Sequence, residues 1–163
     1  MEPKMARIKI ISGAQTGVDR AALDAAIACG LDYGGAIPRG RVAADGPVDK
    51  LYTKLTELKS YDYAVRTRRN VLDSDATLIL CPGPPKGGTA LTERFARELG
   101  RPALVVDIDK KTNRSTIKLV RTWLDVQAPA ILNIAGPRET KHPGLYARVR
   151  KMLEELFQEI AGE

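Results

Sequence analysis

Two glycine-rich segments of the sequence have the residue types of an anion-binding turn. The first is SGAQTGVDRAA at residues 12–22, and the second is PGPPKGGTALTERFA at residues 82–96. Glycine lets the backbone approach a bulky ligand closely, and the free N–H groups of a first helical turn attract negative charge together with the helix dipole. We expect both turns to hold a phosphate or a similar anion, although the same glycines also suit a strand–helix turn that binds nothing. The residues of these turns expected to contact the phosphate or the rest of the ligand are Gly13, Gln15, Thr16, Gly17, Gly83, Lys86, Gly87, Gly88 and Thr89.

The polar residues of these two turns also have structural roles open to them. Thr16 and Asp19 have the spacing of a capping box, which predicts that a helix starts here. Thr89 is expected to cap the helix that follows the second turn. For Thr16 and Asp19, capping and ligand contact remain alternatives. Gln15 has no evident capping role, and its long amide can hydrogen-bond the edge of a heterocycle.

Three further segments place basic or amide side chains where they can reach a ligand. The first segment, residues 38–52 (PRGRVAADGPVDKLY), is long and has no periodic apolar pattern, and such segments are usually functional or disordered. Its two arginines can each form paired hydrogen bonds with an anion. RTRRN (66–70) begins and ends with residues that share one helix face. AGPRET (135–140) follows the last predicted strand. The candidates in these segments are Arg39, Arg41, Arg66, Asn70, Gly136 and Arg138.

The elements that position these residues alternate between strand and helix. Short apolar runs predict buried parallel strands at 7–12, 33–38, 76–81, 102–108 and 130–135. Helical spacing of apolar residues predicts helices at 16–29, 61–73, 90–99, 115–126 and 144–158. This order predicts an α/β fold: a three-layer α/β/α sandwich with a Rossmann-like, mostly parallel sheet of about five strands or more, in a single ligand-binding domain over residues 1–163. Right-handed crossovers bring the segments that follow the strands to the carboxyl edge, where such folds bind ligands.

Several classes of function are disfavoured by motifs and composition. The sequence has no GxGxxG or GxxxxGK[ST] pattern, which argues against an ordinary dinucleotide site or a Walker loop. The net charge is +6, but basic residues are scattered and aromatic residues make up 5% of the chain, so nucleic acid is not the expected partner. The single histidine, His142, precedes a proline as at a helix start, and we predict no protein-ligated metal. With no charged leader and no apolar run near the roughly 18 residues of a membrane span, we expect a cytoplasmic protein and no membrane partner.

Five sequence blocks in one order resemble a known family. Over residues 8 to 150 the chain is similar to the molybdenum cofactor carrier proteins of the SLOG superfamily. The blocks that carry this similarity are SGAQTGVDRAAL, IPRGRVAADGPVDKLY, YAVRTRRNVLDSDATLIL, GGTALT and LNIAGPRE. The resemblance implies a Rossmann-like, homo-oligomeric protein, a dimer or tetramer. It also implies molybdenum cofactor as bound cargo, a pterin that bears a dithiolene and a phosphate, and a molybdoenzyme as recipient. Arg66 and Asn70 are carried over as site residues because they match the third block.

The same superfamily contains phosphoribohydrolases, which have the signature PGGxGTxxE and a catalytic glutamate three residues after threonine. Here Thr92 stands three residues after Thr89, and Glu93 comes one residue later, which rotates its carboxylate by about 100° on a helix. Our leading hypothesis is therefore a binding protein for a phosphorylated pterin or nucleotide-like molecule, used in storage, delivery or sensing. The alternative is a nucleotide-processing hydrolase that uses Glu93 or Asp19. A third hypothesis is a nucleic-acid-binding protein, which the net charge alone suggests.

Overall fold

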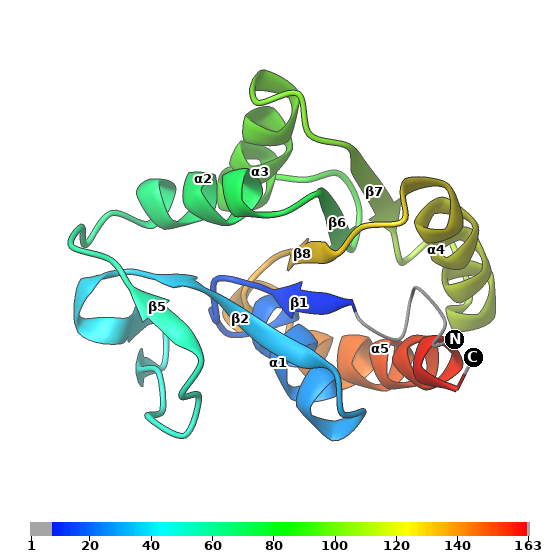
Figure 1. Ribbon diagram of the computed structural model, residues 1–163, viewed down its shortest axis with the longest axis horizontal. Coiled ribbons are helices and arrows are strands. Elements are labelled where there is room, and N and C mark those ends of the chain that lie inside the picture. Colours follow the sequence, from blue (N-terminus) through cyan, green and yellow to red (C-terminus); the bar gives the residue numbers. More distant parts are fainter. Residues whose placement is uncertain (1–7, 163) are drawn as a thin grey trace.

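A six-stranded parallel sheet forms the centre of the computed structural model, which describes residues 8–162. The strands run in the order β5-β2-β1-β8-β6-β7, and every neighbouring pair is parallel (Figure 1). Their bounds are β1 Lys9–Ile11, β2 Asp32–Ile37, β5 Leu55–Glu57, β6 Ala76–Cys81, β7 Ala103–Asp107 and β8 Ile131–Ala135. The predicted three-layer, Rossmann-like fold class is confirmed.

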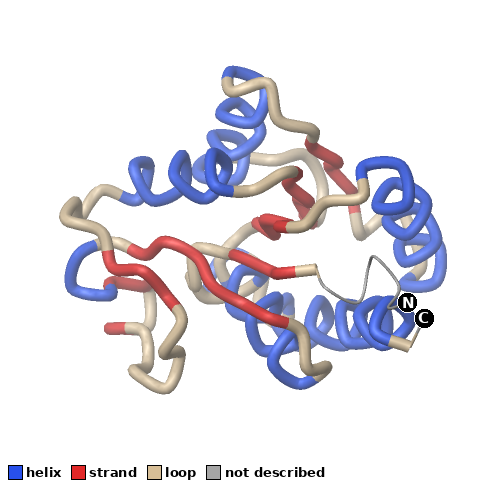
Figure 2. The backbone as a smooth tube through the Cα atoms, viewed as in Figure 1, coloured by secondary structure: helices blue, strands red, loops and turns tan. Residues whose placement is uncertain are grey.

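Five helices cover the two faces of this sheet. They are α1 (Val18–Ala28), α2 (Tyr63–Asp73), α3 (Gly87–Glu98), α4 (Asn113–Gln127) and α5 (Leu145–Ala161). Helices α1, α4 and α5 pack together on one face, while α2 and α3 pack together on the other (Figures 1 and 2). All five predicted helices are present, with ends that differ by a few residues from the predicted ones. Within residues 8–162, no helix is long and apolar enough to cross a membrane.

The strand order reverses beside β1, and this reversal creates the place for a site. The chain leaves β1 toward β2 and β5 on one side, then crosses over to β6 and β7 and returns to insert β8 next to β1. The segments that follow β1, β6 and β8 therefore meet at the centre of the carboxyl edge. In open α/β sheets a reversal of this kind leaves a crevice between diverging loops.

Residues 38–52 fold back on themselves rather than forming an irregular loop. They contain a short 3₁₀ turn (Arg39–Arg41) and a two-stranded hairpin, β3 (Val42–Ala43) and β4 (Gly46–Pro47). The Arg41 guanidinium donates hydrogen bonds to the carbonyl oxygens of Val48, Asp49 and Tyr52, at 2.9, 2.7 and 3.4 Å. This arginine therefore holds the segment together.

Both predicted threonine caps are wrong. Gly17, with a φ of 82°, is the N-cap of α1, and no side chain caps that helix end. The Thr16 hydroxyl oxygen instead accepts a hydrogen bond from the Glu139 backbone N–H at 3.2 Å, because the chain after β8 passes beside it. Helix α3 begins at Gly87 with Lys86 as its N-cap, so Thr89 lies inside the first turn, where its side chain is buried.

Candidate functional site

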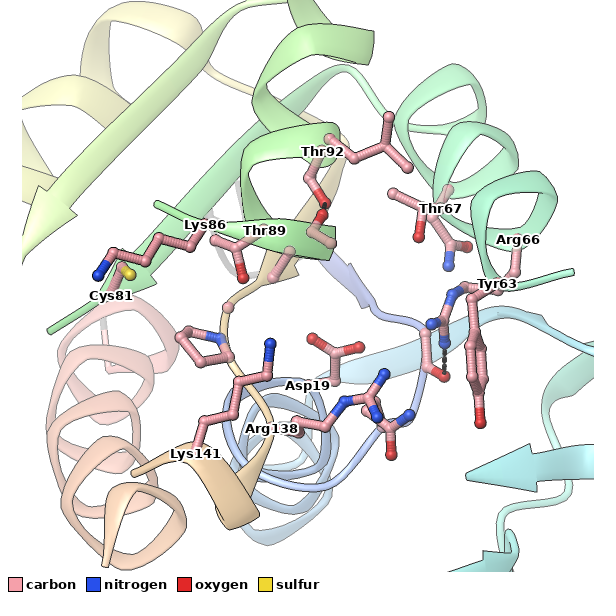
Figure 3. Close-up of a pocket in the computed structure, with 18 of the residues that line it drawn as sticks. Asp19, Tyr63, Arg66, Thr67, Cys81, Lys86, Thr89, Thr92, Arg138 and Lys141 are labelled. Carbon is pink, nitrogen blue, oxygen red and sulfur yellow. Dashed lines mark hydrogen bonds between the residues drawn. The ribbon is translucent and has the colours of Figure 1, made fainter. Parts of the chain in front are cut away.

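A cavity of about 240 Å³ lies at the carboxyl edge, where β1, β6 and β8 end. Figure 3 shows α3 on one side of this cavity, α2 on a second side, and the segment after β8 on a third. Ten of the candidate residues from the sequence line it: Gly13, Gln15, Asp19, Arg66, Asn70, Lys86, Gly88, Thr89, Gly136 and Arg138. Seven candidates lie outside its lining: Thr16, Gly17, Arg39, Arg41, Gly83, Gly87 and Glu93. The two glycine-rich turns thus face one common space.

Four cationic side chains line the cavity. Arg66 comes from α2, and Arg138 and Lys141 come from the segment after β8. Lys86, at the start of α3, directs its amine toward Cys81 and away from Asp19 and Arg138 (Figure 3). Among residues 8–162, neither the Arg138 guanidinium nor either lysine amine has a hydrogen-bond or ion-pair partner. Cations without protein partners at a helix N-terminus are a common arrangement for binding anions.

The two arginines are organised by one aromatic ring. The Arg66 guanidinium lies 5.2 Å from the centroid of the Tyr63 ring, and the Arg138 guanidinium lies 5.6 Å from the same centroid. Arg66 is buried and donates a hydrogen bond to the Gly13 carbonyl oxygen at 2.6 Å. Burial lowers the pKa of Arg66 from its ordinary value, an effect that the nearby Asp19 carboxylate opposes. Arg66 therefore fixes the wall of the cavity, and Arg138 is the arginine available to a ligand.

Asp19 is the only acid among the described residues that line the cavity. It lies in the first turn of α1, and its side chain is almost fully buried. Desolvation raises the pKa of this carboxyl to about 6, although Arg66 and the backbone N–H groups of Gln15 and Gly136 stabilise the charged form. Because the net shift is upward, the loss of hydration outweighs all of these partners.

Gln15 lines the same cavity and has a buried side-chain amide. Gln15 is 6% exposed, and its Oε1 accepts hydrogen bonds from the backbone N–H groups of Thr16 and Ala44, at 3.0 and 2.8 Å. Within the described part of the chain, its Nε2 has no hydrogen-bond partner. A buried donor of this kind is rare in native proteins.

The glycines at the cavity are there for different reasons. A Cβ atom at Gly13 would lie 2.3 Å from Arg66, and one at Gly136 would lie 2.3 Å from the Leu80 carbonyl oxygen, so protein packing excludes side chains at both positions. Gly87 has a φ of +52°, which disfavours other residues. Among the glycines of residues 8–162, Gly88 alone combines an ordinary φ with no heavy atom within 4 Å of a Cβ. Its missing side chain leaves open space at the cavity.

Three arginine and asparagine candidates have structural roles. The Arg39 guanidinium stacks on Tyr61, 5.1 Å from the ring centroid, away from the cavity, and Arg41 is bound to carbonyl groups as described above. Asn70 lines the cavity, but its amide accepts from the Ala36 N–H at 2.7 Å and donates to the Ala36 carbonyl at 3.1 Å. Asn70 therefore anchors the carboxyl end of β2 to α2.

Sequence reasoning missed several lining residues. They are chiefly Tyr63, Thr67, Thr92, Asn133, Lys141 and His142. Asn133 had a readable signal, since it interrupts the apolar run of β8; its amide donates to the Thr77 hydroxyl at 3.3 Å. The others had none, because their contact with the cavity depends on how distant segments pack.

The position at which the hydrolase signature has its catalytic glutamate has no carboxylate in this chain. Thr92, three residues after Thr89, lines the cavity, and its hydroxyl donates to the Gly88 carbonyl oxygen at 3.0 Å. Glu93 is outside the lining. No group of three or more His, Cys, Asp and Glu side chains within residues 8–162 is arranged to hold a metal ion.

Comparison with known proteins places this geometry in a family. Residues 10–157 match the circularly permutated YpsA SLOG family. The crystal structure of a "Putative molybdenum carrier protein" from Syntrophus aciditrophicus SB is 47% identical, with a TM-score of 0.87, and the match covers 91% of this chain and 93% of that one. No curated protein matches the chain. These findings confirm the resemblance drawn from the sequence blocks, and the chain therefore belongs to the circularly permutated YpsA SLOG family.

Proposed function

We propose that this protein binds a phosphorylated pterin or nucleotide-like molecule in the cavity at the carboxyl edge, for storage, delivery or sensing. The observation that carries the proposal is that Arg138 and Lys141, which have no hydrogen-bond or ion-pair partner among residues 8–162, lie at the same cavity as the open position at Gly88. Within the described residues, the backbone N–H groups of Gly87 and Gly88 also have no acceptor, because they are the first two residues of α3 and no helical carbonyl group precedes them. A phosphate at this helix start would be bound by both kinds of donor.

Molybdenum cofactor is the cargo that we propose. The similar protein from Syntrophus aciditrophicus SB is described as a molybdenum carrier, and the cofactor combines a phosphate with a polar ring. The phosphate fits the cations, and the polar ring would lie beside Asp19, which lines the same cavity. At about 240 Å³ the cavity is slightly below the ~300–1,000 Å³ of typical small-molecule sites, which favours one ring with its phosphate over a dinucleotide. The cofactor itself would supply the ligands for its metal.

The proposal also includes the cell biology of a carrier. It comprises a cytoplasmic location, a homo-oligomer of two or four subunits, and a molybdoenzyme that receives the cargo. Sedimentation velocity with and without ligand tests the oligomer, and a monomer under both conditions would contradict that part.

The test is ligand binding measured by calorimetry and thermal shift with sulfate, nucleotides and molybdenum cofactor. Arg138→Gln should weaken the binding of anionic ligands by about 10- to 100-fold, as expected when a charge-assisted hydrogen bond is lost. Arg39→Gln is the matched control, because Arg39 also stacks on a tyrosine but lies outside the cavity lining. Equal affinities in the two variants would refute the proposed site.

A base-release assay with nucleoside monophosphates separates binding from the hydrolase alternative. A carrier should release no base. Turnover that disappears in Asp19→Asn would instead assign the protein to the hydrolases, with Asp19 as the acid, since Asp19 supplies the one carboxyl group that residues 8–162 place at the cavity.

A further inference from the structure

Arg138 is held at the cavity by an aromatic ring, and this contact leaves its hydrogen-bond donors unused. Its guanidinium carbon lies 5.6 Å from the centroid of the Tyr63 ring, and among residues 8–162 the group has no hydrogen-bond or ion-pair partner. The five N–H donors of a guanidinium lie in its plane and can bind two oxygen atoms of one anion. Arg41 differs, because its donors are taken by three backbone carbonyl groups. Arg138 is therefore oriented without being occupied.

The ring itself lies on a fixed part of the chain. Tyr63 is the first residue of α2, and the carboxylate of its N-cap residue, Asp62, accepts a hydrogen bond from the Ala64 N–H at 2.8 Å. In Figure 3 the side chain of Arg138, from the segment after β8, extends toward Tyr63 on α2. A carboxylate in place of the ring would also orient the arginine, but it would compete with an anionic ligand for the same donors. An aromatic ring attracts the cation without taking those donors.

The same ring allows a second guanidinium to lie nearby. The Arg66 guanidinium is 5.2 Å from the ring centroid. Burial lowers the pKa of Arg66 from its ordinary value, and repulsion by the Arg138 charge lowers it further, so the two groups are near enough to repel each other. The negative potential of a ring face attracts both cations and offsets part of this repulsion. Loss of the ring should therefore release Arg138, which is the less buried of the two arginines.

We propose that Tyr63 is a positioning residue of the anion site, which holds the Arg138 guanidinium beside Arg66 through a cation–π contact and leaves the N–H donors of Arg138 to the ligand. An arginine that is already held loses less side-chain freedom when it binds an anion, and this increases the affinity. The ring electrons do this, and the Tyr63 hydroxyl group is not needed. This inference rests on the proposed function, since it assigns Tyr63 a role in binding the anion.

The sulfate affinity of ring variants, measured by calorimetry at one fixed pH, tests the inference. Tyr63→Phe should bind sulfate within about 2-fold of the wild type, because the ring remains. Tyr63→Leu should bind it about 3- to 10-fold more weakly, which is the size expected for a partly exposed cation–π contact. Tyr63→pentafluorophenylalanine keeps the shape of phenylalanine but withdraws electrons from the ring face, so it should be as weak as Tyr63→Leu. Equal affinities of the fluorinated variant and Tyr63→Phe would mean that the ring is a spacer only, and would overturn the proposal.

A double-mutant cycle tests whether the ring acts through Arg138. In the Arg138→Gln background, Tyr63→Leu should change the sulfate affinity by less than about 2-fold, because the contact is already absent. A further loss of about 3-fold or more in this background would show that the ring acts through Arg66 or on the anion itself, and would refute the inference. Tyr61→Leu is the matched control and should bind sulfate as the wild type does, since it removes the ring under Arg39, which lies outside the cavity lining.

The same titrations separate this inference from the function on which it rests. If Arg138→Gln weakens sulfate binding but Tyr63→Leu does not, or binds more tightly, the positioning role is refuted and the anion site remains. If Arg138→Gln binds sulfate as tightly as the wild type, the proposed site is refuted, and the role of Tyr63 with it. Should Tyr63→Leu fail to fold, the comparison of Tyr63→Phe with the fluorinated variant decides the question, because both retain the ring.

Discussion

Replacing Asp19 by asparagine should make the protein more stable at pH 7. The pKa of this carboxyl rises from the ordinary value of 3.8 to about 6 because desolvation of the charge outweighs its attraction to Arg66. Between those two values the folded chain keeps a proton that the unfolded chain has released, so the folded state loses stability as the pH increases. Above about pH 6 this loss is complete.

The size of the effect follows from the shift. The pKa of Asp19 rises by about two units, and each unit corresponds to about 1.4 kcal/mol. The charged Asp19 therefore lowers the free energy of unfolding at pH 7 by about 3 kcal/mol relative to a neutral group. Asparagine is neutral, and its side-chain oxygen can still accept from the N–H groups of Gln15 and Gly136. At about 2–4 °C per kcal/mol for a chain of this size, the melting temperature should increase by about 6–12 °C.

Urea denaturation of both proteins at a series of pH values from 4 to 8 measures this difference directly. The gain in the free energy of unfolding should be largest above pH 6 and should shrink toward zero as the pH approaches 4. Asp125→Asn, at an exposed position of α4, should change stability by less than about 0.5 kcal/mol at every pH. A variant that is less stable than the wild type at pH 7 would mean that the attraction to Arg66 exceeds desolvation. A gain that is independent of pH would exclude titration of Asp19 as its cause.

The same geometry gives three further predictions. Sulfate should bind more tightly as the pH falls from 7 to 5 in His142→Gln, in which the cavity histidine is replaced, because protonation of Asp19 removes the one negative charge among the described cavity residues; calorimetry should show no such increase when Asp19→Asn is added to this variant. Gly88→Val should abolish sulfate binding while the melting temperature stays within a few degrees, because the new side chain enters open space, whereas weaker folding would show that the position is packed. Asn70→Ala should destabilise the protein by about 1–3 kcal/mol in urea, because the buried N–H and C=O groups of Ala36 lose their partners; an unchanged midpoint would contradict this.

The sheet could be predicted from the sequence wherever a strand is buried on both faces. The run at 76–81 is apolar or β-branched throughout, and it forms β6, which is buried at all six positions. By contrast, β5 (Leu55–Glu57) is a three-residue edge strand of sequence LTE with two exposed residues, and it was missed. An edge strand needs no apolar pattern, because it is defined by backbone pairing with its neighbour.

The site was predictable as a place but not as a set of contacts. Strand order and glycine content bring residues 12–17, 82–89 and 136–140 to one edge of the sheet. Local sequence cannot show that Arg41 is occupied by carbonyl groups of its own segment, or that Lys141 reaches the cavity to which Arg138 also points. Each of these outcomes depends on the packing of segments that are distant in sequence. The threonine caps failed for the same reason, since the chain after β8 supplies the partner of Thr16.

Three features of the cavity are unfavourable for folding, and their concentration argues for a ligand. Asp19 is a buried acid whose partners do not compensate for its desolvation, and the Nε2 of Gln15 is a buried donor with no acceptor in the described chain. Gly88 occupies a helical position where alanine would be more stable by about 0.5–1 kcal/mol and would meet no neighbouring atom. A sequence selected for stability alone would replace all three, and a bound molecule accounts for two of them, since it would fill the space at Gly88 and provide a hydrogen-bond donor for Asp19. Local violations of the rules for stable proteins that converge on one cavity are the expected mark of a functional site.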